Sequence, residues 1–428
     1  MALRVIRAGG VGVGARAARR VESSYTSVTI EIADDRVRVA VRPQRRRMRC
    51  PHCDYSTLHR YDTREVDSSW RHLDLGGRVC VLTMRRRRLR CPEHGVLVEA
   101  VDFARPGSGF TRDFEDLAVW LATKTDKSTV SVFCRVTWRT VGAICGRVVA
   151  DKLDPDRFTN LVEIGVDEIS WRRHHKYLTL VSDHETGKIV WGTEGKHTAA
   201  FGTFFTDTLP AGAAERIEAV SMDLGPAYVK AVREHAPQAT ICFDPFHVVK
   251  LATDALDDVR RQVWQHARSL SDKQIAKTYR GARWALLKNP ESLSAKQAST
   301  LKALKRQGGA LVRAYDLKEA LRAVFAGDLD DEEVIAMLAR WCGWAQRCRI
   351  PQFVKLGRTI RKHLDGITAA VERGHANGRH EGLNNKVRLI IRRAYGFHTA
   401  ENALALILLA CGPVTLTLPY HTATHPHS

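Results

Sequence analysis

The chain has no long hydrophobic run. Across its 428 residues, no stretch approaches the roughly 18 uninterrupted apolar residues of a membrane helix, so we expect no membrane partner. The N-terminal sequence MALRVIRAGGVGVGARAARR lacks the large apolar residues that form the core of a secretory signal. Internal repeats and low-complexity tracts are absent as well.

Cysteine is too sparse for a disulfide scaffold. Ten cysteines are spread over the whole chain, and two of them form a single CxxC. Small secreted domains that depend on disulfides carry cysteine at a much higher density. The usage therefore favours a reducing compartment and a metal site.

Acidic residues are also in deficit. The chain carries 67 Lys and Arg against 47 Asp and Glu, which gives a formal net charge of +20 and a pI of about 9.8. This balance indicates a polyanionic partner, most simply nucleic acid, with a merely soluble basic enzyme as the alternative. The apolar fraction of 44% supplies an ordinary core.

The pattern of residues predicts a mixed α/β, multidomain protein. We expect a ribonuclease-H-like core, interrupted by an all-helical insertion and preceded by a small zinc-binding β module and a helix-turn-helix. The core strands are expected at 161–167, 176–182, 188–193, 216–222 and 239–243. The full division is a disordered basic arm (1–25), the zinc-binding β module (26–105), the helix-turn-helix domain (106–155), the first part of the core (156–250), the helical insertion (251–370), the last part of the core (371–415) and a tail (416–428).

Two short motifs predict a structural zinc site. Cys50-Pro-His-Cys53 and Cys91-Pro-Glu-His94 supply four ligands of the kinds that tetrahedral zinc prefers. Four protein ligands leave no open position, so the Zn²⁺ would be structural. His52 and Cys80 are reserve ligands, and the alternative is a chance grouping of free cysteines with a surface histidine.

Basic runs and a pair of helices predict contact with DNA. The helices are expected at 127–135 and 138–149, in helix-turn-helix proportions. Cations that neutralise phosphates release counterions and strengthen binding, although a charge run is more often only a solvated face and most such helix pairs merely pack. The candidate DNA-binding residues are Arg45, Arg46, Arg47, Arg85, Arg86, Arg87, Arg88, Trp138, Arg139 and Thr140.

Three remote acids are the catalytic candidates. Asp167 closes an apolar run that we expect to end as a strand, Asp223 closes a second run, and Glu381 opens the helical segment HEGLNNKVRLIIRRAYGF. Carboxylates at two strand ends and on one helix can hold a pair of hard divalent cations, Mg²⁺ or Mn²⁺, that cut and join phosphodiesters. Glu168 is an alternative ligand, but it points to the opposite face of the strand from Asp167. A lone acid at a strand end is usually a turn or cap residue.

Five further residues are predicted to support this site. Asp244 and His247 form a D-x-x-H at the start of a helix, where both side chains can share a side. On the last helix, Asn385, Arg388 and Arg392 share the face of Glu381, while the other face is apolar.

Together these motifs resemble a known family. CPHC with CPEH, the helix pair, IGVDE, MDLGPAY with DPFH, and NGRHEGLNNKVRLIIRRAYGF are similar to the bacterial insertion-sequence transposases of the ISL-three family, in the DDE group. The similarity covers residues 45–412 or so. One position departs from the family pattern, since CPEH ends in histidine where many relatives carry a second CxxC.

The resemblance implies a function and partners. It implies a DNA transposase that binds the inverted repeats of its insertion sequence and catalyses metal-dependent DNA cleavage and strand transfer, with Asp167, Asp223 and Glu381 in the catalytic positions. Double-stranded DNA, as transposon ends and target, and further copies of the chain on DNA would be its partners, in the bacterial cytoplasm at the nucleoid. The alternatives are a catalytically inactive, transposase-derived DNA-binding regulator, and a nuclease without strand transfer.

Overall fold

The computed structural model describes residues 4–7, 25–172, 176–270, 273–327, 329–374 and 379–418. Its chain forms two compact units, Met1–Asp154 with Leu389–Ser428, and Pro155–Arg388. The boundary between the units falls inside helix α14 (Arg379–Arg393). The segment 371–415, which we expected to complete the core, therefore belongs to both units. Among the described residues, no helix is both long and apolar enough to span a bilayer.

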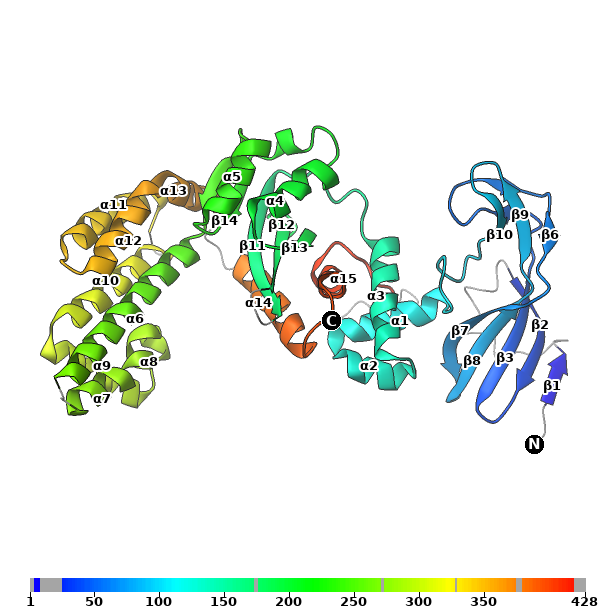
Figure 1. Ribbon diagram of the computed structural model, residues 1–428, viewed down its shortest axis with the longest axis horizontal. Coiled ribbons are helices and arrows are strands. Elements are labelled where there is room, and N and C mark those ends of the chain that lie inside the picture. Colours follow the sequence, from blue (N-terminus) through cyan, green and yellow to red (C-terminus); the bar gives the residue numbers. More distant parts are fainter. Residues whose placement is uncertain are drawn as a thin grey trace. The chain divides into compact units, whose positions relative to one another are not determined.

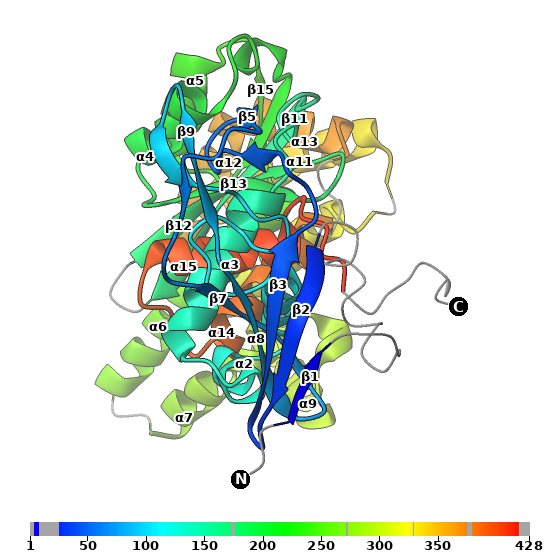
Figure 2. The same cartoon turned by 90° about the vertical axis from the view of Figure 1, so that its right-hand side faces the viewer.

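The first unit begins with a five-stranded sheet. Its order is β1-β2-β3-β8-β7, with β3 and β8 parallel and the other neighbours antiparallel. The strands are β1 (Arg4–Arg7), β2 (Tyr25–Ile32), β3 (Arg36–Pro43), β7 (Ser68–Leu75) and β8 (Arg78–Met84), and Figure 2 shows β1, β2 and β3 alongside one another. Of the arm expected at 1–25, the structure describes residues 4–7, which pair with β2, and Tyr25, which begins β2; the remaining residues lie outside the described part of the chain.

Alternation of buried and exposed residues builds the core of this sheet. Trp70 and Leu82 lie opposite each other on β7 and β8, and Phe103 packs edge-on against Trp70 with ring centroids 5.0 Å apart. Tyr25 packs edge-on against the same phenylalanine, with ring centroids 5.0 Å apart.

The N-terminal segment of the first unit also forms a second, smaller β module. It consists of a two-stranded pair, β4 (Met48–Arg49) with β5 (Ser56–Thr57), and a three-stranded sheet in the order β10-β9-β6. The strands of that sheet are β6 (Asp62–Thr63), β9 (Arg87–Cys91) and β10 (Gly95–Val98). Its core is minimal, with Met48 and Leu89 beside two cysteines. So small a core needs additional stabilisation, which a metal can supply.

Among the described residues, four whole helices lie in the first unit. They are α1 (Arg112–Lys124), α2 (Lys127–Cys134), α3 (Trp138–Lys152) and α15 (Ala400–Cys411), and α15 packs on α1 and α3. Side chains of Thr111, Asp126 and Thr137 cap the N-termini of α1, α2 and α3. Arg135 ends α2 in the left-handed conformation, with φ of 55°.

A buried group of charges fixes α1 and α3. Arg105 donates to Glu115, Asp116 and Asp151 at 2.7–3.0 Å, and both its partners on α1 are buried. Arg147 and Lys152 on α3 bind the same carboxylates. Because each buried carboxylate has a cationic partner, the group specifies how the helices pack.

The second unit contains a mixed five-stranded sheet. Its order is β13-β12-β11-β14-β15, antiparallel among the first three and parallel among the last three. The strands are β11 (Glu163–Arg172), β12 (Lys176–Asp183), β13 (Ile189–Glu194), β14 (Ala219–Met222) and β15 (Thr240–Phe243). The connections carry α4 (Thr198–Thr203), a π-helical turn (Phe204–Thr208) and α5 (Pro226–His235). The five strands overlap the five ranges that the sequence predicted for the core.

Helices occupy the rest of the second unit. They are α6 (Pro245–Ser269), α7 (Lys273–Gly281), α8 (Arg283–Leu287), α9 (Ala295–Gln307), α10 (Ala310–Val324), α11 (Asp331–Arg347), α12 (Pro351–Lys362), α13 (Leu364–Glu372) and the first part of α14 (Arg379–Arg393). Figure 1 shows α6 leading from the sheet into this helical group. One hydrophobic core runs from the sheet into the helices, so the predicted insertion folds as a continuation of the core.

Helix α13 returns the chain to the edge strand β15. At Gly366 a Cβ atom would lie 2.5 Å from the Phe243 ring and 3.0 Å from the Ile241 carbonyl oxygen. Only a glycine permits so close an approach of helix and strand.

Candidate functional site

Two acids lie together at the carboxyl edge of the sheet. Asp223 directly follows β14 and Asp244 directly follows β15, and the last residues of these parallel strands are paired in register. Asp244 also accepts a hydrogen bond from the Phe246 amide at 2.8 Å and so caps α6. The sheet topology therefore brings together two carboxylates that are 21 positions apart in the sequence, from 223 to 244.

His247 joins these two carboxylates. Its Nδ1 lies 2.6 Å from Asp223 Oδ1 and 3.1 Å from Asp244 Oδ2. Burial alone would lower the pKa of His247, but hydrogen bonds to both carboxylates outweigh it and raise the pKa to about 10. His247 is consequently a cation at neutral pH, and the predicted D-x-x-H arrangement, with both side chains on one side, is present.

Asp167 occupies the middle of β11, where we had expected the strand to end. The strand continues to Arg172, and Asp167 pairs with Leu180 of β12. The strand is longer than its apolar run because the backbone pairing with β12 continues past Asp167 to Arg172.

The carboxylate of Asp167 is buried and only partly satisfied. Oδ1 accepts from the Glu168 amide at 2.7 Å, while Oδ2 is buried and has no hydrogen-bond partner among the described residues. Burial and the charge of Asp223 raise the pKa of Asp167 to about 6, against the opposing effect of His247 and Arg388. An orphan oxygen beside a second carboxylate is the environment that a bound cation would relieve.

The N-terminal half of α14 lines the same pocket. Leu383 and Asn384 lie around a space of about 40 Å³ together with Asp167, Asp223, Asp244 and His247. That volume has room for a few water-sized species. Glu381 lies one turn earlier on α14, and its side chain is outside the described part of the chain.

The other predicted residues of α14 lie at its surface. Asn385, Arg388 and Arg392 are exposed, and Arg388 donates to the Asn385 side chain at 3.4 Å. The opposite face is packed, with Val387 and Ile390 buried as predicted. Among the described side chains, the carboxylates do not form a group of three ligand atoms within 4.8 Å of one another.

Asn384 is the pocket residue that sequence reasoning missed. We chose Asn385 because it lies four positions after Glu381, but Asn384 lies three positions after it, and both spacings bring side chains onto one helix face. The adjacent asparagines could not be ranked without knowing how α14 is rotated against the sheet.

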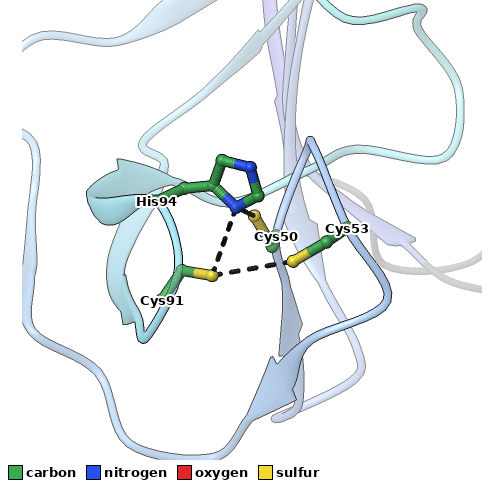
Figure 3. Close-up of side chains that lie close together, drawn as sticks. All are labelled: Cys50, Cys53, Cys91 and His94. Carbon is green, nitrogen blue, oxygen red and sulfur yellow. Dashed lines mark hydrogen bonds between the residues drawn. The ribbon is translucent and has the colours of Figure 1, made fainter.

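The four predicted zinc ligands lie close together in the structure. They are Cys50, Cys53, Cys91 and His94. Their ligand atoms all lie within 4.8 Å of one another, and Figure 3 shows the four side chains pointing to a common centre. Sγ of Cys53 and Sγ of Cys91 are 3.6 Å apart, and His94 Nδ1 lies 3.6 Å and 3.9 Å from Sγ of Cys91 and Cys50. A tetrahedron with Zn–S bonds of about 2.3 Å has edges of about 3.8 Å, so the group fits zinc.

The reserve ligands do not belong to this group. Cys80 is buried in the five-stranded sheet on β8, and His52 is exposed with its ring centroid 5.5 Å from that of His94. The histidine of CPEH is therefore the fourth member of the cluster.

Comparisons with known proteins agree with this order of modules. Residues 37–94 match the zinc-finger of transposase IS204/IS1001/IS1096/IS1165, residues 99–149 match the helix-turn-helix domain of transposase family ISL3, and residues 164–407 match the ISL3 transposase domain of the DDE group. The chain belongs to the ISL3 family of transposases. It is thus an insertion-sequence transposase, with a zinc ribbon, a helix-turn-helix and a DDE domain in the predicted order.

Individual relatives cover most of the transposase. The transposase for insertion sequence element IS1557 of Mycobacterium tuberculosis is 41% identical over 405 residues, which span 90% of each chain. The transposase for insertion sequence element IS1001 of Bordetella parapertussis is 29% identical over 326 residues, 75% of this chain and 79% of the relative.

The two basic runs of the zinc ribbon differ in their surroundings. Arg87 binds the buried Glu99 through Nε at 3.0 Å, and Arg88 forms an ion pair with Asp62. Arg86 is partly buried, and its guanidinium lies over the Trp70 ring. These three arginines therefore hold the module together, because acids across the small sheet pair with Arg87 and Arg88. Their predicted contact with DNA stays a prediction.

The first run has the opposite character. Arg45, Arg46 and Arg47 are exposed and form no ion pair with any residue that the structure describes. Arg87 Nη1 donates to the carbonyl oxygens of Arg45 and Arg46 at 3.2–3.3 Å, so the internal arginine supports the exposed loop.

The start of the second helix of the helix-turn-helix is partly packed. Trp138 is half-buried, edge-on to His398 at 4.8 Å, and Lys127 Nζ lies 4.6 Å from its ring centroid. Arg139 is exposed, and Thr140 shares a 2.8 Å hydrogen bond with Thr137. An HTH domain implies DNA binding. Of the three DNA-binding candidates on α3, Arg139 is the exposed one.

Proposed function

We propose that this transposase binds the terminal inverted repeats of its element and cuts and joins DNA strands with a pair of Mg²⁺ or Mn²⁺ ions. Asp167, Asp223 and Glu381 would hold the ions. The observation that carries the proposal is the buried oxygen of Asp167, which has no hydrogen-bond partner among the described residues and lies beside Asp223 in a pocket that α14 also lines. Oxygen donors of this kind suit hard divalent cations.

The metal pair and the protein would divide the work. When bound, the ions activate the attacking water or 3′-hydroxyl and stabilise the leaving oxygen of the phosphodiester. His247 keeps Asp223 and Asp244 in fixed orientations through its two hydrogen bonds. Arg388 and its neighbour Asn385, with Arg392 further along, supply polar and cationic groups at the surface of α14 for the DNA backbone.

The zinc ribbon and the helix-turn-helix would supply recognition. The exposed loop Arg45–Arg47 would offer three cations for phosphates, and the exposed Arg139 at the start of α3 would contact bases. Further copies of the chain on DNA would allow two ends to be processed together.

The proposal is tested by cleavage of the DNA that flanks the transposase's own gene. Purified protein should cut this duplex at the element end in the presence of Mg²⁺ and leave it intact without Mg²⁺. Asp167→Asn, Asp223→Asn and Glu381→Gln should each reduce the rate by about 10³-fold or more, because each removes a metal ligand while DNA binding is retained.

Glu168→Gln is the matched control for Asp167→Asn. The two residues are adjacent on β11 and point to opposite faces, so the control should cut at close to the wild-type rate. Normal cleavage by any of the three catalytic-site variants would remove that residue from the site. Binding of the ends without any cleavage by the wild-type protein would instead support the regulator.

A further inference from the structure

A second hollow in the Pro155–Arg388 unit begins beside the catalytic acids. It has a volume of about 910 Å³ and is lined by Leu224, which follows Asp223, and by Phe243, which precedes Asp244. From there it extends between α5 and the junction of α12 with α13. The chain segments that place the two acids therefore also form one end of this hollow, which we call the α5–α13 groove.

The walls of the α5–α13 groove carry uncompensated positive charge. Lys230 and Arg233 project from α5 and Lys362 from the end of α12; all three are exposed, and none forms an ion pair with a described residue. Among the lining residues that the structure describes, Asp365 is the one carboxylate. Burial and the charge of Lys362 lower the pKa of His363, so this residue is neutral at pH 7 and leaves the balance at three cations to one anion.

The floor of the groove is apolar and closely packed. Phe243 packs edge-on against His363 with ring centroids 5.0 Å apart, and Gly366 brings α13 into direct contact with the same phenylalanine. The two walls are thereby fixed to the edge strand of the sheet. A preformed channel with cations along its sides and an apolar floor suits a polyanion with flat, apolar groups between its charges.

We propose that the α5–α13 groove binds the phosphate backbone of the DNA strand that is cut at the acids. This inference rests on the proposed function, because it takes the scissile phosphate to lie at Asp167 and Asp223. A strand held there must leave the acids along the protein surface, and the groove offers cations directly beside them. The excess of positive charge favours DNA over an acidic protein segment, which would need a matched set of hydrogen bonds.

The test neutralises the cations of the groove and compares a matched surface triple. The groove variant is Lys230→Gln, Arg233→Gln and Lys362→Gln. The control is Lys296→Gln, Lys302→Gln and Arg306→Gln on α9, which removes the same charge from exposed residues that do not line the groove. Fluorescence anisotropy would measure binding of a duplex spanning the element end and its flank at several KCl concentrations, without Mg²⁺.

The groove variant should bind about 10- to 100-fold more weakly near 0.1 M salt, with the slope of log K against log salt reduced by about two to three. The control should change affinity less than about threefold. Equal affinities and slopes for the two variants would overturn the proposal, as would unchanged DNA binding with an altered sedimentation coefficient, which would assign the groove to a protein partner. Cleavage of the same duplex by the wild-type protein with Mg²⁺ tests the proposed function separately. If the wild-type protein does not cut the duplex but the groove variant still binds more weakly than the control, only the proposed function is contradicted.

Discussion

The surroundings of the buried Asp167 carboxyl group disfavour its negatively charged form. Its folded-state pKa of about 6 lies above the ordinary value of 3.8. A carboxyl group with a raised folded pKa favours folding below its unfolded pKa, and this contribution is lost as the pH rises through the folded pKa. In the absence of Mg²⁺ the wild-type protein should therefore lose stability between about pH 4 and pH 6 at this position.

Asp167→Asn should avoid this loss of stability, because asparagine does not ionise. In buffer without Mg²⁺ at pH 7.5, the variant should melt at a higher temperature than wild type, and the difference should shrink at pH 5. Addition of Mg²⁺ should raise the Tm of wild type but not of the variant. Thermal unfolding followed by circular dichroism measures all three. A variant that is less stable than wild type at both pH values would show that the carboxylate is not under electrostatic strain.

Asn384 and Asn385 give a second test at the scale of a residue. Asn384 lines the acid pocket, whereas Asn385 is exposed. Asn384→Ala should reduce Mg²⁺-dependent cleavage by about 10- to 100-fold and raise the Mg²⁺ concentration needed for half-maximal rate, because an amide beside the ligands is lost. Asn385→Ala should stay within about threefold of wild type on both measures. A larger loss of cleavage in Asn385→Ala than in Asn384→Ala would instead assign the supporting role to Asn385, the residue that the sequence spacing predicted.

Gly366 tests how one element is fixed to another. Alanine there would place its Cβ 2.5 Å from the Phe243 ring, so Gly366→Ala should destabilise the transposase by about 1–3 kcal/mol through overpacking of α13 on β15. Gly343→Ala is the matched control, since its Cβ would meet only the flexible Arg347 side chain at 3.7 Å on α11. The control should be neutral or stabilise by about 0.5–1 kcal/mol, because alanine favours a helix. Urea unfolding measures both, and equal effects would contradict the close packing.

The zinc ribbon is the element that depends most on a bound ion. His94→Ala should lower the zinc content from about one ion per chain and weaken end binding, because three cysteines leave the tetrahedral site incomplete. His52→Ala should retain the zinc, since this neighbouring histidine lies outside the cluster. Metal analysis of the purified proteins measures the zinc content of both variants. Loss of zinc from His52→Ala would show that His52 is a zinc ligand.

The elements themselves were largely predictable from the sequence. The strands and helices of the core follow from apolar runs punctuated by Gly, Pro and Asp, and the motifs CPHC and CPEH identify their own ligands. What could not be predicted depends on partners remote in the chain. The continuation of β11 past Asp167 depends on pairing with β12, and the pairing of Arg87 with Glu99 depends on how two short strands are placed.

For the whole molecule, the order of modules was predictable but the division into compact units was not. Helix α14 contributes Asn384 to the acid pocket, while its last residue, Arg393, donates to the carbonyl oxygens of Thr123 and Lys124 at the end of α1. The periodicity of α14 reveals its apolar face. It does not reveal that one continuous helix serves two units, because that depends on which surfaces meet its two halves.

The proposed function depends above all on a shared metal position for Asp167, Asp223 and Glu381. Fe²⁺ accepts the same oxygen ligands as Mg²⁺, and with peroxide it generates radicals that cut the polypeptide beside the bound ion. Cleavage mapped by mass spectrometry should fall in three segments, around residues 167, 223 and 381. Excess Mg²⁺ and the Asp167→Asn variant should both suppress it, whereas any cuts near the zinc ribbon should persist. Cuts around 167 and 223 with none near 381, or a pattern unaffected by Mg²⁺, would contradict the shared site.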